Sequence, residues 1–455
     1  MKKILLGLCM VLLSLLVLAC SKASPQQTSG SGTIPKEERN MDDLSDAVDA
    51  ILNEATADFI GNYSVTEGFF YWIAGEYSED VILEIVKTGD VSDPEIWFEK
   101  TGSSIHVLWQ DYCESTGLDA YDYSHIHKVE TADDTVVSLD FSGDVNLCED
   151  AATTIHMDAA ENGILDCFSE DLISEMQGAD IFVVNNEFAY TTRGEPLEGK
   201  AFTFRANPER VNELFKIGCD LVTLANNHVW DYGIEGITDT LDTLNSVNMP
   251  YVGAGYNLAD ASRAQYYIAN GRKIAIVDAT QIERSYTYTK QATVDTPGVL
   301  KTLNSELYCK VIEDAKKHSD VVIACVHWGT EGNTSYGADQ IKLANEFVAA
   351  GADVIVGGHT HCLQGIEYIE DVPVYYSLGN YWFATSANMP ADYNTGLARI
   401  EITNDLEIVC KFIPCRFSGG VTSLLGQSDA EEIYDELNEL SNSVTISDLG
   451  IVIKY

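Results

Sequence analysis

Asparagine, histidine and acidic side chains recur at the ends of the segments that this sequence predicts as buried strands. The densest group follows the apolar run Leu221–Leu224 and consists of Asn226, Asn227, His228 and Asp231. Polar groups packed this closely are hard to place in a core, and open α/β sheets bind ligands beyond the carboxyl ends of their strands. For this stretch taken alone, a turn whose asparagines bond only the backbone is the alternative interpretation.

Five further predicted strands end in the same types of residue. The segments that follow them are Ser142 to Asn146, Asn185 to Glu187, His327 to Glu331, Gly357 to His361 and Ser377 to Asn380. Carboxylate, amide and imidazole groups are ligands of divalent metals. Two cations bridged by a carboxylate lower the pKa of a shared water and neutralise charge on a phosphoryl oxygen. A turn explains any one of these motifs, but their recurrence at six strand ends predicts a metal-dependent hydrolytic site.

The elements that would carry these motifs alternate between strand and helix. Residues 135–425 show this alternation and then a late run of strands, which predicts an α/β domain with two sheets, or one large mixed sheet, flanked by helices. Residues 426–455 follow as a helix and tail. Residues 41–130 predict a small, mainly helical domain of unknown role, in which the aromatic segment Phe69–Ile73 is expected to pack inward.

The charge of the chain limits its partners. With 71 acidic and 27 basic residues, the net charge is −44. Such a surface repels nucleic acid, so a nucleic-acid-binding role is excluded, and an anionic substrate requires a local cation. Outside the first 20 residues, nine cysteines form no C-x-x-C pair, so a disulfide framework is not expected.

The N-terminus has the pattern of an export signal. Two lysines precede the apolar run Ile4–Ala19, and Cys20 follows Ala19 as in a bacterial lipoprotein cleavage site. We therefore expect residues 1–20 to be a lipoprotein signal peptide, with Cys20 lipidated and the protein anchored extracytoplasmically to the cell membrane. An uncleaved membrane anchor is the alternative. Residues 21–40 are polar and Ser/Gly-rich, which predicts a flexible linker.

Taken together, the motifs resemble a known family. They are Gly143-Asp144-Val145, Asn185-Asn186-Glu187, Leu224 to Gly233, His327 to Glu331, Gly358 to His361 and Ser377 to Asn380, with Asn207-Pro208-Glu209 and Val252 to Gly255 between them. This combination over residues 135–415 resembles the CapA family of poly-γ-glutamate capsule-synthesis proteins, which is related to the calcineurin-like metallophosphatases. The resemblance implies a metallophosphatase-like layered fold with two β-sheets flanked by helices.

The same resemblance implies roles for individual residues. Two divalent ions (Mn, Zn or Fe) would be held by Asp144, Glu187, Asn227, His327, His359 and His361. His228 would be the catalytic acid, assisted by Asp231. Asn146, Asn226, Glu331 and Asn380 would support the ligands or meet the substrate. Two positions depart from the phosphatases, because Asn146 stands where they have a histidine and Glu187 replaces their bridging aspartate.

Three functions compete at this stage. The first is a lipid-anchored metal-dependent hydrolase acting on a phosphoester or an anionic polymer. The second is a non-catalytic scaffold that binds or exports polymer beside membrane capsule-synthesis subunits. The third, a solute- or wall-binding lipoprotein using residues 41–130, is the weakest, because the aromatic cluster is better explained as core.

Overall fold

A computed structural model describes residues 44–54, 67–88, 94–117 and 125–455. Cys20, with the predicted signal peptide 1–20 and linker 21–40, lies outside the described residues. In the part of the chain that is described, no helix has both the length and the apolar character needed to cross a membrane.

The N-terminal region is helical, as predicted. Its helices are α2 (Leu44–Glu54), α3 (Glu67–Glu76), α4 (Glu79–Thr88), α5 (Pro94–Thr101) and α6 (Ile105–Thr116). Phe69 and Phe70 of α3 are fully buried, and Phe69 meets the Trp109 ring of α6 edge-on at 5.0 Å. The prediction that the aromatic segment packs inward is therefore confirmed for Phe69, Phe70 and Ile73, whereas Tyr71 is exposed.

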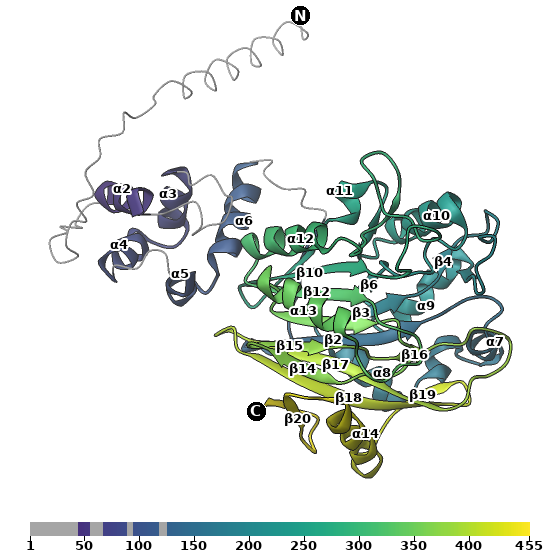
Figure 1. The fold of residues 1–455 in the computed structure, drawn as a ribbon. Helices are drawn as coiled ribbons and strands as arrows, with labels where there is room; N and C mark the ends of the chain where they lie inside the picture. The colour runs from purple at the N-terminus through teal and green to yellow at the C-terminus, as the bar shows by residue number, and fades with distance from the viewer. Residues whose placement is uncertain (1–43, 55–66, 89–93, 118–124) are drawn as a thin grey trace, which may run out of the picture. The chain divides into compact units, whose positions relative to one another are not determined.

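Two large sheets form the rest of the chain (Figure 1). The first has the order β1-β9-β10-β12-β13-β15-β14, and its central strands β10, β12, β13 and β15 are parallel. Its strands are β1 (Ile126–Lys128), β9 (Gln265–Ala269), β10 (Arg272–Thr280), β12 (Val321–His327), β13 (Val354–Gly358), β14 (Ile366–Ile369) and β15 (Val372–Tyr375). Strand β1 lies in the range that the sequence suggested for the N-terminal domain, yet it pairs with β9 of this sheet.

The second sheet has the order β19-β18-β17-β2-β3-β6-β7, and β16 also pairs with β2. Strands β2, β3, β6 and β7 are parallel, whereas β17 to β19 are antiparallel. The bounds are β2 (Val136–Val145), β3 (Ile181–Asn186), β6 (Leu221–Thr223), β7 (Tyr251–Val252), β16 (Asn380–Trp382), β17 (Tyr393–Thr403), β18 (Ile408–Ser418) and β19 (Val421–Leu424). Small pairs complete the strands: β4 (Ala189–Tyr190) with β5 (Arg205–Ala206), β8 (Ala254–Gly255) with β11 (Gly298–Val299), and β20 (Val444–Ile446) with β21 (Val452–Lys454).

The alternation of side chains along the strands builds three cores. In β3, Ile181 and Val183 face the other sheet, whereas Phe182 and Val184 face the outer helices. In β12, Ile323 also lies in the core between the sheets. Because successive side chains of a strand point to opposite faces, each central strand fills two cores at once, which explains its continuous hydrophobic sequence.

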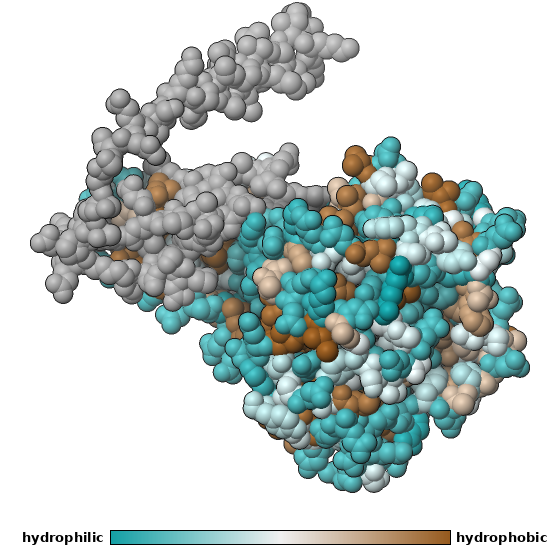
Figure 2. All heavy atoms as spheres, in the orientation of Figure 1, coloured by the Kyte–Doolittle hydropathy of each residue, from teal (hydrophilic) through white to brown (hydrophobic). Residues whose placement is uncertain are grey.

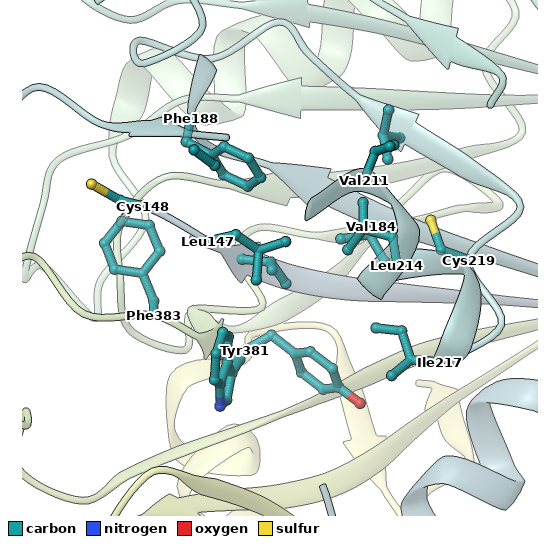
Figure 3. Close-up of a cluster of buried hydrophobic side chains, with 14 of the residues drawn as sticks. Leu147, Cys148, Val184, Phe188, Val211, Leu214, Ile217, Cys219, Tyr381 and Phe383 are labelled. Carbon is teal, nitrogen blue, oxygen red and sulfur yellow. The ribbon is translucent and has the colours of Figure 1, made fainter. Parts of the chain in front are cut away.

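Helices cover the outer face of each sheet (Figure 1). Figure 3 shows Val211 and Leu214 of α9 packed with Val184 of β3 and with Leu147. The helices of this region are α7 (Ala152–Ala159), α8 (Glu170–Gly178), α9 (Val211–Lys216), α10 (Gly233–Ser246), α11 (Leu258–Ala261), α12 (Ser305–Lys317), α13 (Ala338–Ala349) and α14 (Gln427–Leu440), with short 3₁₀ turns η3 (Gly163–Cys167) and η4 (Pro208–Arg210). Helix α14 differs from the others, because its buried residues belong to the core between the sheets. The predicted α/β fold of two sheets flanked by helices is confirmed.

Polar residues dominate the face of the α/β region in Figure 2, with hydrophobic residues scattered between them. The nine cysteines of the described residues are free thiols, and most of them are buried.

Candidate metal centre

The predicted site residues come from the carboxyl ends of neighbouring parallel strands. Asp144 of β2 is in register with Asn185 of β3 and with Asn380 of β16, and His327 of β12 is in register with Gly358 of β13. Parallel neighbours end at the same edge of a sheet, so chain segments far apart in sequence meet there.

Five of the six predicted metal ligands form two overlapping groups. Glu187, His327 and His359 make one group, and Asp144, Glu187 and His361 make the other, with the ligand atoms of each group within 4.8 Å of one another. Glu187 belongs to both groups and therefore lies between them. The sixth residue, Asn227, places Oδ1 2.9 Å from Nε2 of His327.

The Glu187 carboxylate is the least expected feature of this cluster. The side chain is fully buried, and neither oxygen accepts a hydrogen bond. Its Oε1 lies 3.4 Å from Nε2 of His327, and the neighbouring Asp144 carboxylate is also fully buried. Burying the Glu187 carboxyl group with no donor to either oxygen is costly, so the position fits a ligand of a divalent metal ion.

His359 and His361, which follow β13, both have positive φ angles. His359 has φ of 95° and His361 has φ of 58°, a region that residues other than glycine seldom adopt. His359 Nδ1 lies 3.1 Å from Nε2 of His327. His361 Nδ1 lies 2.7 Å from Oδ1 of Asn380 and 3.2 Å from Oδ2 of Asp144, so Asn380 helps to orient the ring. Strain of this kind persists where the surroundings hold it and is concentrated at functional sites.

His228 and Asp231 form a buried pair beside the cluster. His228 Nδ1 lies 2.7 Å from Oδ2 of Asp231, while its Nε2 lies 4.0 Å from Oε1 of Glu187. Asp231 also accepts a hydrogen bond of 2.7 Å from the Phe204 amide. A carboxylate on Nδ1 fixes the ring orientation and directs Nε2 toward the metal-ligand groups, which is the arrangement of an acid–base histidine.

The electrostatics of the cluster follow from burial and crowding. Burial, and next the Asp144 carboxylate, raises the pKa of Glu187 well above its usual range. Burial lowers the pKa of His327 to about 4, and burial with the nearby His327 lowers that of His359. Burial opposes charge on His361, but Asp144 and Glu187 raise its pKa to about 10. His327 and His359 are therefore neutral imidazoles, the form that binds a metal ion, whereas His361 holds a proton that it must release to bind one.

The predicted supporting residues differ in their contacts. Asn226 accepts from the amides of His228 and Val229 and thereby holds the turn. The Asn146 side chain donates a hydrogen bond of 3.0 Å to the Ala384 carbonyl and accepts one of 2.8 Å from the Cys148 amide. Both of its polar groups are therefore bonded to the backbone. Glu331 is exposed, and among the described contacts no hydrogen bond joins it to a histidine. Its charge makes a small contribution to the raised pKa of His361 and partly opposes the lowering of the pKa of His327.

Three residues of the site received no individual role from the sequence. Asn185 donates to Oδ1 of Asp144 at 2.7 Å, and its position at a strand end was a signal that could have identified it. Asp278 is buried and accepts from the Ala225 amide at 2.7 Å. Lys200 reaches Asp231 at 2.6 Å from a long loop that has no recognisable pattern.

Comparison with known families identifies the chain. The sequence profile described as bacterial capsule synthesis protein PGA_cap matches residues 138–385, which contain every predicted metal ligand. The chain belongs to this family. It is 32% identical over 286 residues to the PGA biosynthesis protein CapA of Bacillus subtilis (strain 168), covering 61% of this chain and 73% of that one. It is 31% identical over 242 residues to the capsule biosynthesis protein CapA of Bacillus anthracis, covering 51% and 57%.

Solved structures give more distant likenesses to this PGA_cap protein. A novel phosphatase from Mycoplasma pneumoniae aligns with a TM-score of 0.39 and 17% identity, covering 62% of this chain and 93% of that one. A 5'-nucleotidase from Candida albicans SC5314 aligns with a TM-score of 0.32 and 12% identity, covering 59% and 52%. These TM-scores are too low to support the fold assignment, which is based instead on the strand order described above.

Proposed function

We propose that this PGA_cap protein is a metal-dependent hydrolase of capsule synthesis, with a phosphatase-like centre that acts on a phosphoester or on the anionic polymer. One observation carries the proposal: the buried Glu187 carboxylate has no hydrogen-bond donor and lies among His327, His359, His361 and Asp144. A structural role gives no reason to bury an unbonded carboxylate there, whereas a bridging metal ligand does.

Each residue has a distinct task in this proposal. Asp144, Glu187, Asn227, His327, His359 and His361 would hold divalent ions. When bound, such ions activate water and neutralise anionic charge on the substrate. Asp231 holds the ring of His228, whose Nε2 is placed to exchange a proton with the group that reacts. The surface repels an anionic substrate at a net charge of −44, so a cationic centre is also needed for binding.

The metal content of the full-length protein is the first test. We expect about two equivalents of Mn²⁺, Zn²⁺ or Fe in the wild type. Glu187→Ala and His359→Ala should each lose metal, because each removes a ligand. His156→Ala is the matched control, since it changes a histidine of α7 outside the cluster. Wild-type protein without metal after loading would contradict the proposal.

Hydrolysis is the second test. The loaded protein would be assayed on phosphodiesters and on poly-γ-glutamate, with Glu187→Ala and His156→Ala in parallel. We expect turnover that depends on metal and is lost only in Glu187→Ala. If both substrates remain intact while metal binds normally, the scaffold function would replace the hydrolase.

We also propose that the protein is anchored outside the cytoplasm through a lipid on Cys20. The proposal rests on the apolar run that ends at Ala19-Cys20. Metabolic labelling with an alkyne fatty acid should mark the wild type but not Cys20→Ser, and Cys20→Ser should leave the membrane fraction. Equal labelling of both proteins would contradict the anchor.

A further inference from the structure

A loop between β4 and β5, residues 191–204, folds over the turn that carries Asn227, His228 and Asp231. The Leu197 amide donates to the Asp231 carbonyl at 2.9 Å, and the Phe204 amide donates to its carboxylate at 2.7 Å. The two ends of the loop segment 197–204 are therefore both hydrogen-bonded to Asp231 of the turn.

Lys200 lies at the centre of this contact, with only 8% of its side chain exposed. Its ammonium donates to Oδ1 of Asp231 at 2.6 Å and to the carbonyl oxygen of Asn227, and it lies 3.2 Å from Oε1 of Glu283. A buried ammonium requires good acceptors, and here two of them belong to residues four positions apart in one turn.

These contacts bear directly on the orientation of two site residues. The Asn227 carbonyl accepts from Lys200 and, at 3.1 Å, from Oγ1 of Thr289, so its peptide is held from two sides. The side chain of Asn227 extends from that fixed peptide, and its Oδ1 lies 2.9 Å from Nε2 of His327. In the same way, Oδ1 of Asp231 is fixed by Lys200 while its Oδ2 orients His228.

We propose that Lys200 is a positioning residue, whose ammonium clamps the Asn227–Asp231 turn against the metal centre through Asp231, the Asn227 carbonyl and Glu283. The inference rests on the proposed function in so far as the turn serves a metal. Lys200 itself contacts no metal ligand atom among the contacts described, so it acts through Asn227 and His228.

Hydrogen exchange of the metal-free, full-length protein tests the clamp. In Lys200→Met we expect amides 225–233 to exchange at least about tenfold faster than in the wild type, while the two sheets keep their protection. Lys200→Arg should restore protection in part, since it keeps the charge. Lys216→Met, which removes a surface lysine paired with Glu213, is the control. Unchanged exchange in Lys200→Met would overturn the clamp.

A milder variant keeps the test decisive if Lys200→Met does not fold. Glu283→Gln removes only one of the three contacts of the ammonium, so we expect a smaller increase in exchange at the same amides. Exchange of amides 225–233 equal to that of the wild type in a folded Glu283→Gln would overturn the clamp.

Titration with Co²⁺ separates this inference from the proposed function. We expect the wild type to show the visible absorption bands of bound Co²⁺. Lys200→Met should bind Co²⁺ about 10–100-fold more weakly and with altered bands, because loss of a residue that orients metal ligands commonly weakens metal binding by this much. Lys200→Arg should recover part of the affinity. Identical affinity and bands in Lys200→Met would overturn the inference and leave the proposed function intact. A wild type that takes up no Co²⁺ would defeat the proposed function, and the exchange experiment would still decide the clamp.

Discussion

Among the individual residues, Glu187 links the chemistry of the centre to the stability of the protein. Its carboxylate and that of Asp144 are both fully buried and repel each other. Such a pair destabilises the metal-free protein and is stabilised by cations, so the same side chain has opposite effects in the two states.

We predict that Glu187→Gln raises the thermal midpoint of the metal-free protein. Burial raises the pKa of Glu187, so this carboxyl group must take up a proton when the chain folds at neutral pH, and an amide of the same shape removes that cost. The expected gain is on the order of 1–3 kcal/mol in the free energy of unfolding. The same variant should lose the stabilisation that Mn²⁺ or Zn²⁺ gives the wild type. Calorimetry with and without metal measures both effects, and a lower midpoint in the metal-free variant would show that Glu187 stabilises the fold.

His228 depends on Asp231 for its orientation. We predict that Asp231→Asn lowers kcat about 10²–10⁴-fold in any metal-dependent hydrolysis, because the 2.7 Å contact to Nδ1 fixes the ring and its proton. Metal content should remain near that of the wild type, since Asp231 belongs to neither ligand group and the asparagine oxygen can still accept the hydrogen bond from Lys200. An active Asp231→Asn enzyme would remove His228 from the acid–base role.

At the level of elements, the end of β2 brings Asp144 into the centre. The pairing of β2 with β3 shifts register between Phe141 and Asp144, and the Asp144 amide donates to the Gly379 carbonyl at 2.9 Å. A Cβ on Gly143 would collide with that same carbonyl oxygen. Glycine at position 143 therefore allows β2 and the loop before β16 to approach closely.

We predict that Gly143→Ala destabilises the protein by about 2–3 kcal/mol and weakens metal binding, because the backbone at Asp144 must move. Gly178→Ala at the end of α8 is the control: no atom lies within 4 Å of its added Cβ, and its effect should stay below about 1 kcal/mol. Denaturant unfolding and metal titration measure the two effects. Equal stability of the two variants would contradict the close approach.

For the molecule as a whole, polar contacts attach the N-terminal helices to the first sheet. Arg272 of β10 pairs with Glu95 of α5 through bonds of 3.0 and 2.6 Å, and Ser104 donates to Asp320 at 2.7 Å. Lys273, next to Arg272, is buried, and burial lowers its pKa to about 8. A buried lysine with such a pKa reduces stability at neutral pH.

We predict that Lys273→Met stabilises the protein by on the order of 2 kcal/mol at pH 7. The folded-state pKa of about 8 lies below the ordinary lysine value of 10.5, so the folded wild type loses a proton that the unfolded chain retains between these values. Wild-type stability therefore rises with pH across this window, and the advantage of Lys273→Met should shrink. Denaturant unfolding at pH 7 and at pH 9.5 measures the difference in stability between Lys273→Met and the wild type. Lys310→Met, which changes an exposed lysine, is the control. An advantage that does not change with pH would contradict the lowered pKa.

Much of this architecture could be predicted because it depends on local patterns. The continuous apolar runs at Ile181–Val184 and Val321–Val326 predicted buried strands, and both are strands with side chains in two cores. The position of polar motifs at strand ends predicted that Glu187 and His327 would meet, since parallel strands end at one edge. Asn146 is different: sequence alone could not show that its side chain bonds the Ala384 carbonyl, 238 positions away.

The sequence by itself determined the family, the α/β alternation and the set of metal-ligand types, because each depends on residue identity and short spacing. Only the tertiary structure decided that β1 joins the first sheet, that Glu187 is buried without a hydrogen-bond donor, and that Lys200 grips the turn at Asp231. These features arise from contacts between segments distant in the chain. No local pattern specifies such contacts, because their energy depends on which groups the completed fold excludes from water.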